Sequence, residues 1–339
     1  MRDNAAKTLM LRKALDASGR RFIYDEETET SYEKDYTWVE EGRRLLSFAN
    51  GYAGSISDCF IIYVIAVLGP CDRRTVQIAL RMLKVKSAGL YIEDPENDKN
   101  IQSRIAALGK CGMLFAHTYT AVESIEGGGE RKIPVRLYTA DKDSINLMNN
   151  KLRKRVPVNH YIATKQLSEL IEYASCAYIT AAMSTNKNFQ SYLDGVFRSK
   201  YLGSYYFPGE IKFSGNTGIT YVAVVGGYLF FDPRIMTQDD FNDIRATKIT
   251  AIKNYIMYRS KKGRCCVVIV VQDNDDLVDM AQVILRFDMI HEDLCNIYFT
   301  GEGCMRYAKE VNQAFLQMKI CPGEEVPFDF EYTVPDFLD

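Results

Sequence analysis

The sequence has few of the features that mark metal-binding, secreted or membrane proteins. Its nine cysteines include no Cys-x-x-Cys pair, and its three histidines, His117, His160 and His291, are scattered. No uncharged apolar run reaches the roughly 18 residues that a membrane helix needs. The charged N-terminus lacks the apolar core of a signal peptide. We therefore expect a cytoplasmic protein with reduced cysteines, no metal site, no cofactor and no membrane partner.

The chain is not a polycation either, because its net charge is −2 over 339 residues. The charge is divided unevenly: residues 1–159 hold 25 Lys and Arg against 21 Asp and Glu, and the remainder holds 17 against 23. A mildly basic front half suits a localised surface for DNA. The length is enough for two domains.

The most informative stretch runs from Asp58 to Ala140. Its pattern predicts three helices and then two strands joined by a glycine-rich loop at 127–129, which is the element order of a winged helix-turn-helix. The predicted helices are Asp58–Leu68, Arg73–Lys84 and Lys99–Cys111, and the predicted strands are Met113–Thr120 and Ile133–Thr139.

Local signals support the bounds of these helices. Gly69-Pro70 stops the first helix, Asp72 can cap the second, and Gly112 follows the third in the manner of a C-terminal glycine.

A recognition helix in the major groove needs polar and cationic side chains opposite its core face. The third helix is expected to supply most of them and the second helix the rest, while the loop between the strands carries two cations that suit phosphate or the minor groove. The predicted DNA-binding residues are Lys99, Asn100, Gln102, Ser103, Arg104 and Lys110, then Arg73 and Arg74, and finally Arg131 and Lys132. Winged helices also bind proteins, so a protein-interaction role stays open.

The flanking segments set the predicted domain boundaries. Ala5–Asp16 is an amphipathic helix that is either an arm for DNA or a partner, or a helix packed on its own domain. Asp141–Lys154 is a helix with a basic end, and Val156-Pro157 breaks the chain after it. We predict an N-terminal extension at 1–50, a winged-helix domain at 51–156, an α/β domain at 157–320 and an acidic tail at 321–339.

The second half alternates strands and helices, which predicts a mixed sheet with helices on both faces. Cys265–Val271 is a continuous apolar run, the pattern of a buried central strand. Gly226-Gly227 predicts a two-residue hairpin. The predicted helices are Tyr161–Met183, Gln238–Arg259, Asp275–Phe287 and Gly303–Met318, and the other strands are Ser204–Phe213, Thr220–Val225, Tyr228–Phe231 and Cys295–Thr300.

This order resembles the restriction-endonuclease-like fold, with an αβββαβ core. Together with the front half, the chain resembles the replication-relaxation family of plasmids and integrative elements, which pairs a winged helix with a degenerate nuclease-like domain. The resemblance rests on Arg104–Phe115 (RIAALGKCGMLF), Tyr221–Pro233 (YVAVVGGYLFFDP) and the following helix and strand (KITAIKNYIMY…CCVVIVV). It implies an α+β protein that binds double-stranded DNA in replication, transfer or transcription control.

Nuclease chemistry in that fold requires an acid on one strand and Asp/Glu-x-Lys on the next, because the carboxylates hold Mg²⁺ and the lysine orients water. Asp232 follows the predicted strand Tyr228–Phe231, where one acid could lie, but Pro233-Arg234 after it do not give the x-Lys pattern. The alternative is Glu210-Ile211-Lys212, which does give Glu-x-Lys, with Asp194 or Glu172 upstream. Glu210, Lys212 and Asp232 are thus the candidate catalytic residues.

Three functions follow from the sequence. The favoured one is a DNA-binding accessory or regulatory protein, with the back domain available for partner contact, homodimerisation or a residual nucleic-acid surface. The alternatives are a Mg²⁺-dependent endonuclease or nickase and a protein-interaction scaffold.

Overall fold

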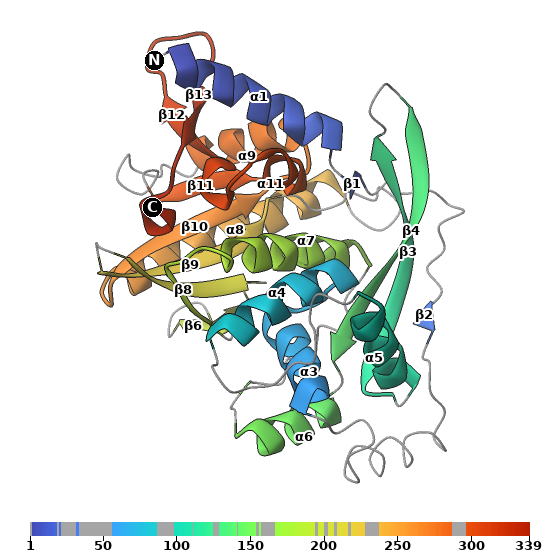
Figure 1. The fold of residues 1–339 in the computed structure, drawn as a ribbon. Helices are drawn as coiled ribbons and strands as arrows, with labels where there is room; N and C mark the ends of the chain where they lie inside the picture. The colour runs from blue at the N-terminus through green and yellow to red at the C-terminus, as the bar shows by residue number, and fades with distance from the viewer. Residues whose placement is uncertain are drawn as a thin grey trace. The chain divides into compact units, whose positions relative to one another are not determined.

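The computed structural model describes the parts of the chain that carry most of its regular structure. These are residues 2–18, 20–21, 32–33, 56–86, 98–110, 112–124, 129–140, 142–153, 156, 167–193, 196–199, 203–206, 209–215, 218–227, 237–286 and 296–339. The protein is of the mixed α+β class (Figure 1). None of the described helices combines the length and the apolar character that crossing a bilayer requires.

The chain forms two compact units. Unit 1 comprises Met1–Tyr24, Ala121–Lys132 and Asn186–Asp339, and unit 2 comprises Asp25–Thr120 and Ile133–Thr185. This division differs from the predicted boundaries at 50, 156 and 320, since both ends of the chain lie in one unit.

A seven-stranded mixed sheet forms the centre of unit 1, in the order β13-β12-β11-β10-β9-β8-β5. The three central strands, β9, β10 and β11, are parallel, and each outer neighbour pairs antiparallel. The strands are β5 (Phe189–Tyr192), β8 (Gly209–Gly215), β9 (Gly218–Gly226), β10 (Arg264–Val270), β11 (Ile297–Thr300), β12 (Phe315–Ile320) and β13 (Phe328–Thr333). A separate hairpin pairs β6 (Val196–Ser199) with β7 (Gly203–Tyr206).

The expectation of a buried central strand is confirmed, because every residue of β10 after Arg264 is buried. Two helices connect the parallel strands: α8 (Gln238–Arg259) joins β9 to β10, and α9 (Asn274–Arg286) joins β10 to β11. A reciprocal capping box sets the start of α8, because the Thr237 hydroxyl accepts from the Asp240 amide while the Asp240 carboxylate accepts from the Thr237 amide.

The predicted helix over Gly303–Met318 is wrong. Only α11 (Glu302–Tyr307) and a 3-10 turn, η2 (Val311–Gln313), are helical there, and the chain then enters β12. Phe315 and Leu316 are fully buried between strands on both sides, so tertiary packing decides the structure of an apolar run that reads equally well as helix.

The acidic tail is not a loose end, contrary to the expectation of an extended cover or mobile end. β13 pairs along its whole length with β12, and Phe328 and Phe330 are buried while Asp329 and Glu331 are exposed. A final 3-10 turn, η3 (Asp336–Leu338), also buries its apolar residues.

β8 pairs antiparallel with β9 up to Gly215 and Gly218, and the predicted hairpin at Gly226-Gly227 stays a prediction. Gly226 ends β9, and the Gly227 amide donates to the Val270 carbonyl at 2.7 Å. A Cβ on Gly227 would come within 2.8 Å of Ile269, so this position accepts only glycine without rearrangement. The expected strand at 228–231 lies outside the described residues.

The N-terminal helix α1 (Arg2–Ser18) packs on unit 1, which confirms the packing interpretation of this segment. Leu11, Ala14 and Leu15 are buried, and α1 contacts α11, β13 and α9 (Figure 1). Asn274, the first residue of α9, binds α1 through two side-chain hydrogen bonds. Its side chain accepts from Arg12 Nε at 3.0 Å and donates to the Asp16 carboxylate at 2.6 Å.

Unit 2 is built around an apolar helix, α3, which packs against α4, α5, α6 and α7. Almost all of its side chains are buried, which explains why it is hydrophobic on every face. The helices are α3 (Ile56–Leu68), α4 (Arg73–Lys86), α5 (Asp98–Lys110), α6 (Lys142–Leu152) and α7 (Leu167–Met183). The hairpin of β3 (Leu114–Ser124) and β4 (Glu130–Ala140) follows α5, and its segment at 121–132 belongs to unit 1. The short strand β2 (Tyr32–Glu33) pairs with the part of β3 in unit 2, and β1 (Arg20–Arg21), which belongs to unit 1, pairs with the end of β3 in unit 1.

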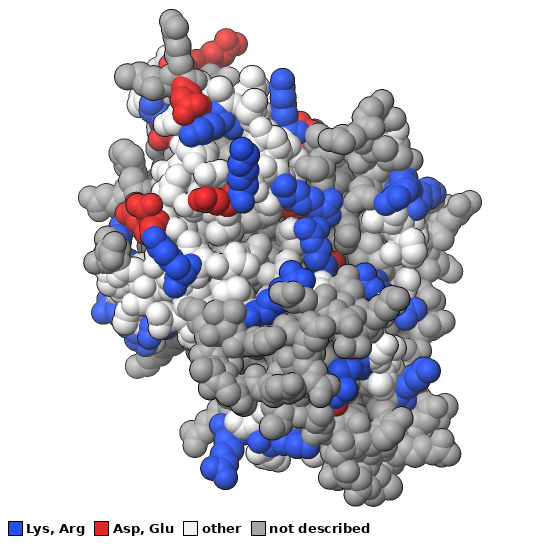
Figure 2. Space-filling view, in the orientation of Figure 1, with Lys and Arg blue, Asp and Glu red and all other residues white. Residues whose placement is uncertain are grey.

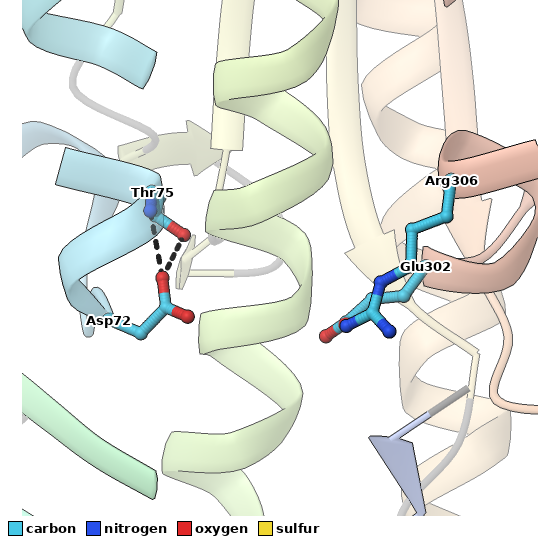
Figure 3. A network of polar contacts seen from close by, with 4 residues as sticks. All are labelled: Asp72, Thr75, Glu302 and Arg306. Atoms are coloured by element: carbon cyan, nitrogen blue, oxygen red, sulfur yellow. Dashed lines mark hydrogen bonds and ion pairs between the residues drawn. The ribbon is translucent and has the colours of Figure 1, made fainter. Parts of the chain in front are cut away.

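The predicted helix signals act as expected in this unit. Asp72 Oδ1 accepts from the Thr75 amide at 2.8 Å and from the Thr75 hydroxyl at 2.7 Å, which caps α4 (Figure 3). Gly69 and Gly112 both have positive φ, at 89° and 67°, where α3 and α5 end. An isolated antiparallel β-bridge between the backbones of Cys71 and Tyr138 joins the turn before α4 to β4.

Candidate nucleic-acid interface

Helix α5, the predicted recognition helix, buries one face and exposes the other. Ile101, Ile105 and Leu108 are buried at helical spacing, as the sequence predicts. The exposed side chains on the opposite side are Gln102, Ser103, Ala106, Ala107 and Lys110. The exposed face therefore carries two neutral polar side chains, two alanines and a cation at the C-terminal end. Lys99 and Asn100 lie in the first turn of α5, but their side chains are outside the described residues.

Arg104 does not lie on this exposed face in the way the sequence suggests. Its guanidinium binds the buried carboxylate of Asp58 in a fork, with Nε 2.9 Å from Oδ1 and the second nitrogen 3.1 Å from Oδ2. Asp58 lies in the first turn of α3, so this ion pair fixes α5 on α3. A buried carboxylate needs such a partner. We therefore assign Arg104 a positioning role within unit 2.

The two arginines at the start of α4 also differ from each other. Arg73 donates to Gln102 Oε1 at 2.8 Å across the exposed surface, which links α4 to the outer face of α5. Arg74 lies over the ring of Tyr178 in α7, 5.2 Å from its centroid. Arg73 is thus part of the α5 surface, whereas Arg74 helps pack α4 on α7.

Exposed and buried side chains alternate along the second half of β4, and two of the exposed ones are cations. Lys132, Pro134 and Arg136 are exposed, while Val135 and Leu137 are buried. Arg131 is exposed as well. Arg131 and Lys132 belong to the hairpin segment that groups with unit 1, whereas Arg136 belongs to unit 2. Sequence analysis missed Arg136, although its spacing of four residues from Lys132 in a strand places both on one face.

Figure 2 shows how charge is distributed on one face of the molecule. Over the described part of unit 2, the charged side chains on view are mostly lysine and arginine. Figure 3 also draws Glu302 and Arg306 of unit 1, which form an ion pair at 3.2 Å within α11.

The candidate catalytic residues do not form a nuclease-like group in the described structure. Glu210 lies on β8 with its side chain fully buried, where it accepts from the Tyr255 hydroxyl at 2.9 Å and pairs with Arg259 at 2.5 Å. The guanidinium of Arg259 also lies 5.0 Å from the centroid of the Tyr221 ring. The predicted metal-binding acid is thus held by two residues of α8.

The pKa of the Tyr255 phenol is shifted by this buried environment. Its burial and the nearby Glu210 carboxylate raise its pKa well above the ordinary value, so it stays protonated as a hydrogen-bond donor. Lys212 lies two residues beyond Glu210 and is opposite Tyr221 of β9. Asp232 and Asp194 lie outside the described residues, and Glu172 is buried on α7 in unit 2. Within the described ranges, no three His, Cys, Asp or Glu residues are grouped so as to hold a metal ion.

Ligands commonly bind at the carboxyl ends of the parallel strands in α/β sheets. In this protein, residues at the carboxyl ends of β9 and β10 form hydrogen bonds with other residues of unit 1. Asp273 Oδ1 accepts from the Asp276 amide at 3.0 Å, which confirms the interpretation of these acids as a helix cap. Burial, and then the charge of Asp273, raise the pKa of Asp276 to about 7. Lys248 of α8 donates to the Gly226 carbonyl at 3.0 Å, at the end of β9.

Comparison with known proteins adds no relative: the chain matches no protein-family model, no curated protein sequence and no solved structure.

Proposed function

We propose that this protein binds double-stranded DNA through a winged helix-turn-helix formed by α3, α4, α5 and the β3–β4 hairpin, with α5 as the recognition helix. The observation that carries the proposal is the outer face of α5. It combines Gln102, Ser103 and Lys110 on a helix that is anchored from its other side. Amide and lysine side chains on an exposed helix are suited to base edges and phosphates.

The order of elements supports the proposal. Three helices followed by a long hairpin is the order of a winged helix, and the hairpin carries exposed cations on β4. In the other unit, β5, β8, β9, α8 and β10, with the separate β6–β7 hairpin inserted after β5, follow the strand–strand–strand–helix–strand order of the restriction-endonuclease-like core. That combination is the one expected of a replication-relaxation-like accessory protein of a mobile element.

The engagement of Glu210 by Arg259 and Tyr255 favours a binding role over a nuclease role. A carboxylate that is already neutralised by a guanidinium is a poor ligand for Mg²⁺, because the cation would have to displace Arg259. We therefore propose an accessory or regulatory function, without strand cleavage by Glu210.

The test compares two matched double variants. Gln102→Ala/Lys110→Ala changes the exposed face of α5, and Asn146→Ala/Lys142→Ala removes one amide and one lysine from exposed positions of α6. A preferred duplex is first selected from a random pool, and affinities are then measured by fluorescence anisotropy over a range of salt concentrations.

We expect the α5 variant to lose roughly 1–3 kcal/mol of discrimination for the preferred duplex through Gln102, and to have a shallower salt dependence by about one phosphate contact through Lys110. The α6 variant should behave as wild type. Equal binding by both variants would remove α5 from the interface, and affinity independent of salt would instead indicate a protein-binding module.

A further inference from the structure

The C-terminal part of α8 in unit 1 and the turn after it carry a second cationic surface, remote in sequence from α5. Lys253, Lys261 and Lys262 are exposed, and the acidic residues of this helix, among them Asp239 and Asp243, lie at its opposite end. Lys253 lies one helical turn before Met257 on α8, and Lys261 and Lys262 lie in the turn that follows the end of α8 at Arg259.

These lysines are not neutralised within the described structure. No ion pair with a carboxylate is found for any of the three among the residues of unit 1 that the structure describes. The neighbouring Arg264 is different, because it is paired with Asp336 at 2.8 Å. The cationic charge therefore stays available at the surface, in the half of the chain that is acidic overall.

Exposed apolar side chains accompany the lysines. Met257 is 58% exposed and Tyr258 is 39% exposed, and Lys262 Nζ lies 3.0 Å from the Tyr258 hydroxyl and 4.8 Å from the centroid of its ring. Attraction to the C-terminal end of the helix dipole accounts for the lysines. It does not account for a methionine and a tyrosine held in solvent between them, whereas contact with a nucleotide chain would use both kinds of side chain.

We propose that Lys253, Met257, Tyr258, Lys261 and Lys262, which we call the α8 surface, form a second nucleic-acid contact of this protein. The lysines bind backbone phosphates, and Met257 and Tyr258 pack against sugars or bases. The inference rests on the proposed function only for the class of ligand, because it places the contact on a different unit. Such a contact adds affinity without reading sequence.

The experiment uses the full chain and three sets of substitutions. Lys253→Ala/Lys261→Ala/Lys262→Ala removes the cations of the α8 surface, and Lys187→Ala/Lys309→Ala/Lys319→Ala removes three exposed lysines elsewhere in unit 1, with the same change in net charge. Gln102→Ala/Lys110→Ala serves as the α5 set. Binding to a DNA duplex of random sequence is measured against salt, and binding to phosphatidylserine and phosphatidylcholine vesicles is measured by co-sedimentation.

If each lysine of the α8 surface contacts one phosphate, its triple variant should reduce the slope of log affinity against log salt by about 2.7. The ratio of wild-type to variant affinity should then shrink by about 40-fold between about 50 and about 200 mM salt. The Lys187 control set should keep the wild-type slope. Tyr258→Ala should weaken binding without changing the slope, because a ring contact releases no counterion.

The outcomes separate this inference from the proposed function. A lower slope in the α8 set with no effect of the α5 set would support the α8 surface and overturn α5 as the recognition helix. The reverse result would overturn the α8 surface alone. Loss of phosphatidylserine binding in the α8 set, with unchanged DNA affinity, would overturn the nucleic-acid contact in favour of a membrane surface. A wild-type protein that binds no duplex would overturn both.

Discussion

The buried ion pair between Glu210 and Arg259 gives a sharp test of the structure of unit 1. Removing Arg259 would take from the fully buried Glu210 carboxylate the guanidinium that neutralises it, while the hydrogen bond from the Tyr255 hydroxyl stays. Breaking a buried pair from one side typically costs about 3–5 kcal/mol, because the remaining charge has lost both water and its partner. We expect Arg259→Met, which keeps much of the apolar stem, to destabilise the sheet by this amount.

The assay is native-state hydrogen exchange followed by mass spectrometry, read on peptides from β8, β9 and β10. A loss of about 3–5 kcal/mol should lower the protection of these strands by roughly 10²- to 10⁴-fold. The matched control is Arg264→Met, whose partner Asp336 is exposed, as is Arg264 itself. An exposed pair contributes at most about 1 kcal/mol, so protection should change little.

A double variant then isolates the electrostatic cause. Glu210→Gln/Arg259→Met removes both charges and keeps an acceptor for the Tyr255 hydroxyl, so it should be closer to wild type than Arg259→Met alone. The reasoning would be refuted if Arg259→Met opened the sheet no more than Arg264→Met. It would equally fail if the double variant were as unstable as the single one.

Two further predictions concern pH and one concerns docking of α1. Burial lowers the pKa of His117 to about 4, so the fold favours its neutral form. The free energy of unfolding of unit 2 should therefore fall by up to about 3 kcal/mol as pH falls from about 6.5 to about 4. The stabilities of wild type and His117→Gln, measured by urea titration, should converge in acid. The pKa of Asp276 is raised to about 7 from an ordinary value of 3.8, so its contribution has the opposite sign: unit 1 should lose stability as pH rises between these values, and Asp276→Asn should remove that dependence. Asn274→Ala deletes the side-chain bonds to Arg12 and Asp16, and hydrogen exchange of α1 should become faster while β10 is unchanged; equal exchange of α1 would contradict its anchoring by Asn274.

The sequence predicts best where the signal is local. The bounds of α3, α4, α5 and α8 lie within about two residues of the predicted ones, because caps, glycines and apolar spacing all act within one helix. β10 was also predictable, since an apolar run bounded by charged residues has few other stable environments. In these cases the deciding information is carried by adjacent residues.

Prediction fails where a partner far along the chain decides. The apolar segment around Phe315 fits a helix by itself, and it becomes β12 because β11 and β13 lie on either side of it. The docking of α1 depends on Asn274, 258 residues from Asp16, and on the close packing of Leu15 against Gly301. No local pattern in the sequence encodes either contact.

The same physical reason divides the cations of this protein into two groups. Asp58 and Glu210 are buried carboxylates, and each binds an arginine. Asp58 binds Arg104, which lies 46 residues later in the chain. Glu210 binds Arg259 and also accepts a hydrogen bond from Tyr255 of the same helix, α8. A planar guanidinium can bind a carboxylate with two parallel bonds, as Arg104 does with Asp58, whereas Arg259 contacts Glu210 through Oε1. Arg104 and Arg259 therefore each stabilise their own unit, and a DNA contact by the half-buried Arg104 stays a prediction. Exposed cations with no buried acid to satisfy, Lys110 on α5 and the lysines of the α8 surface, are the ones that we expect to contact phosphate.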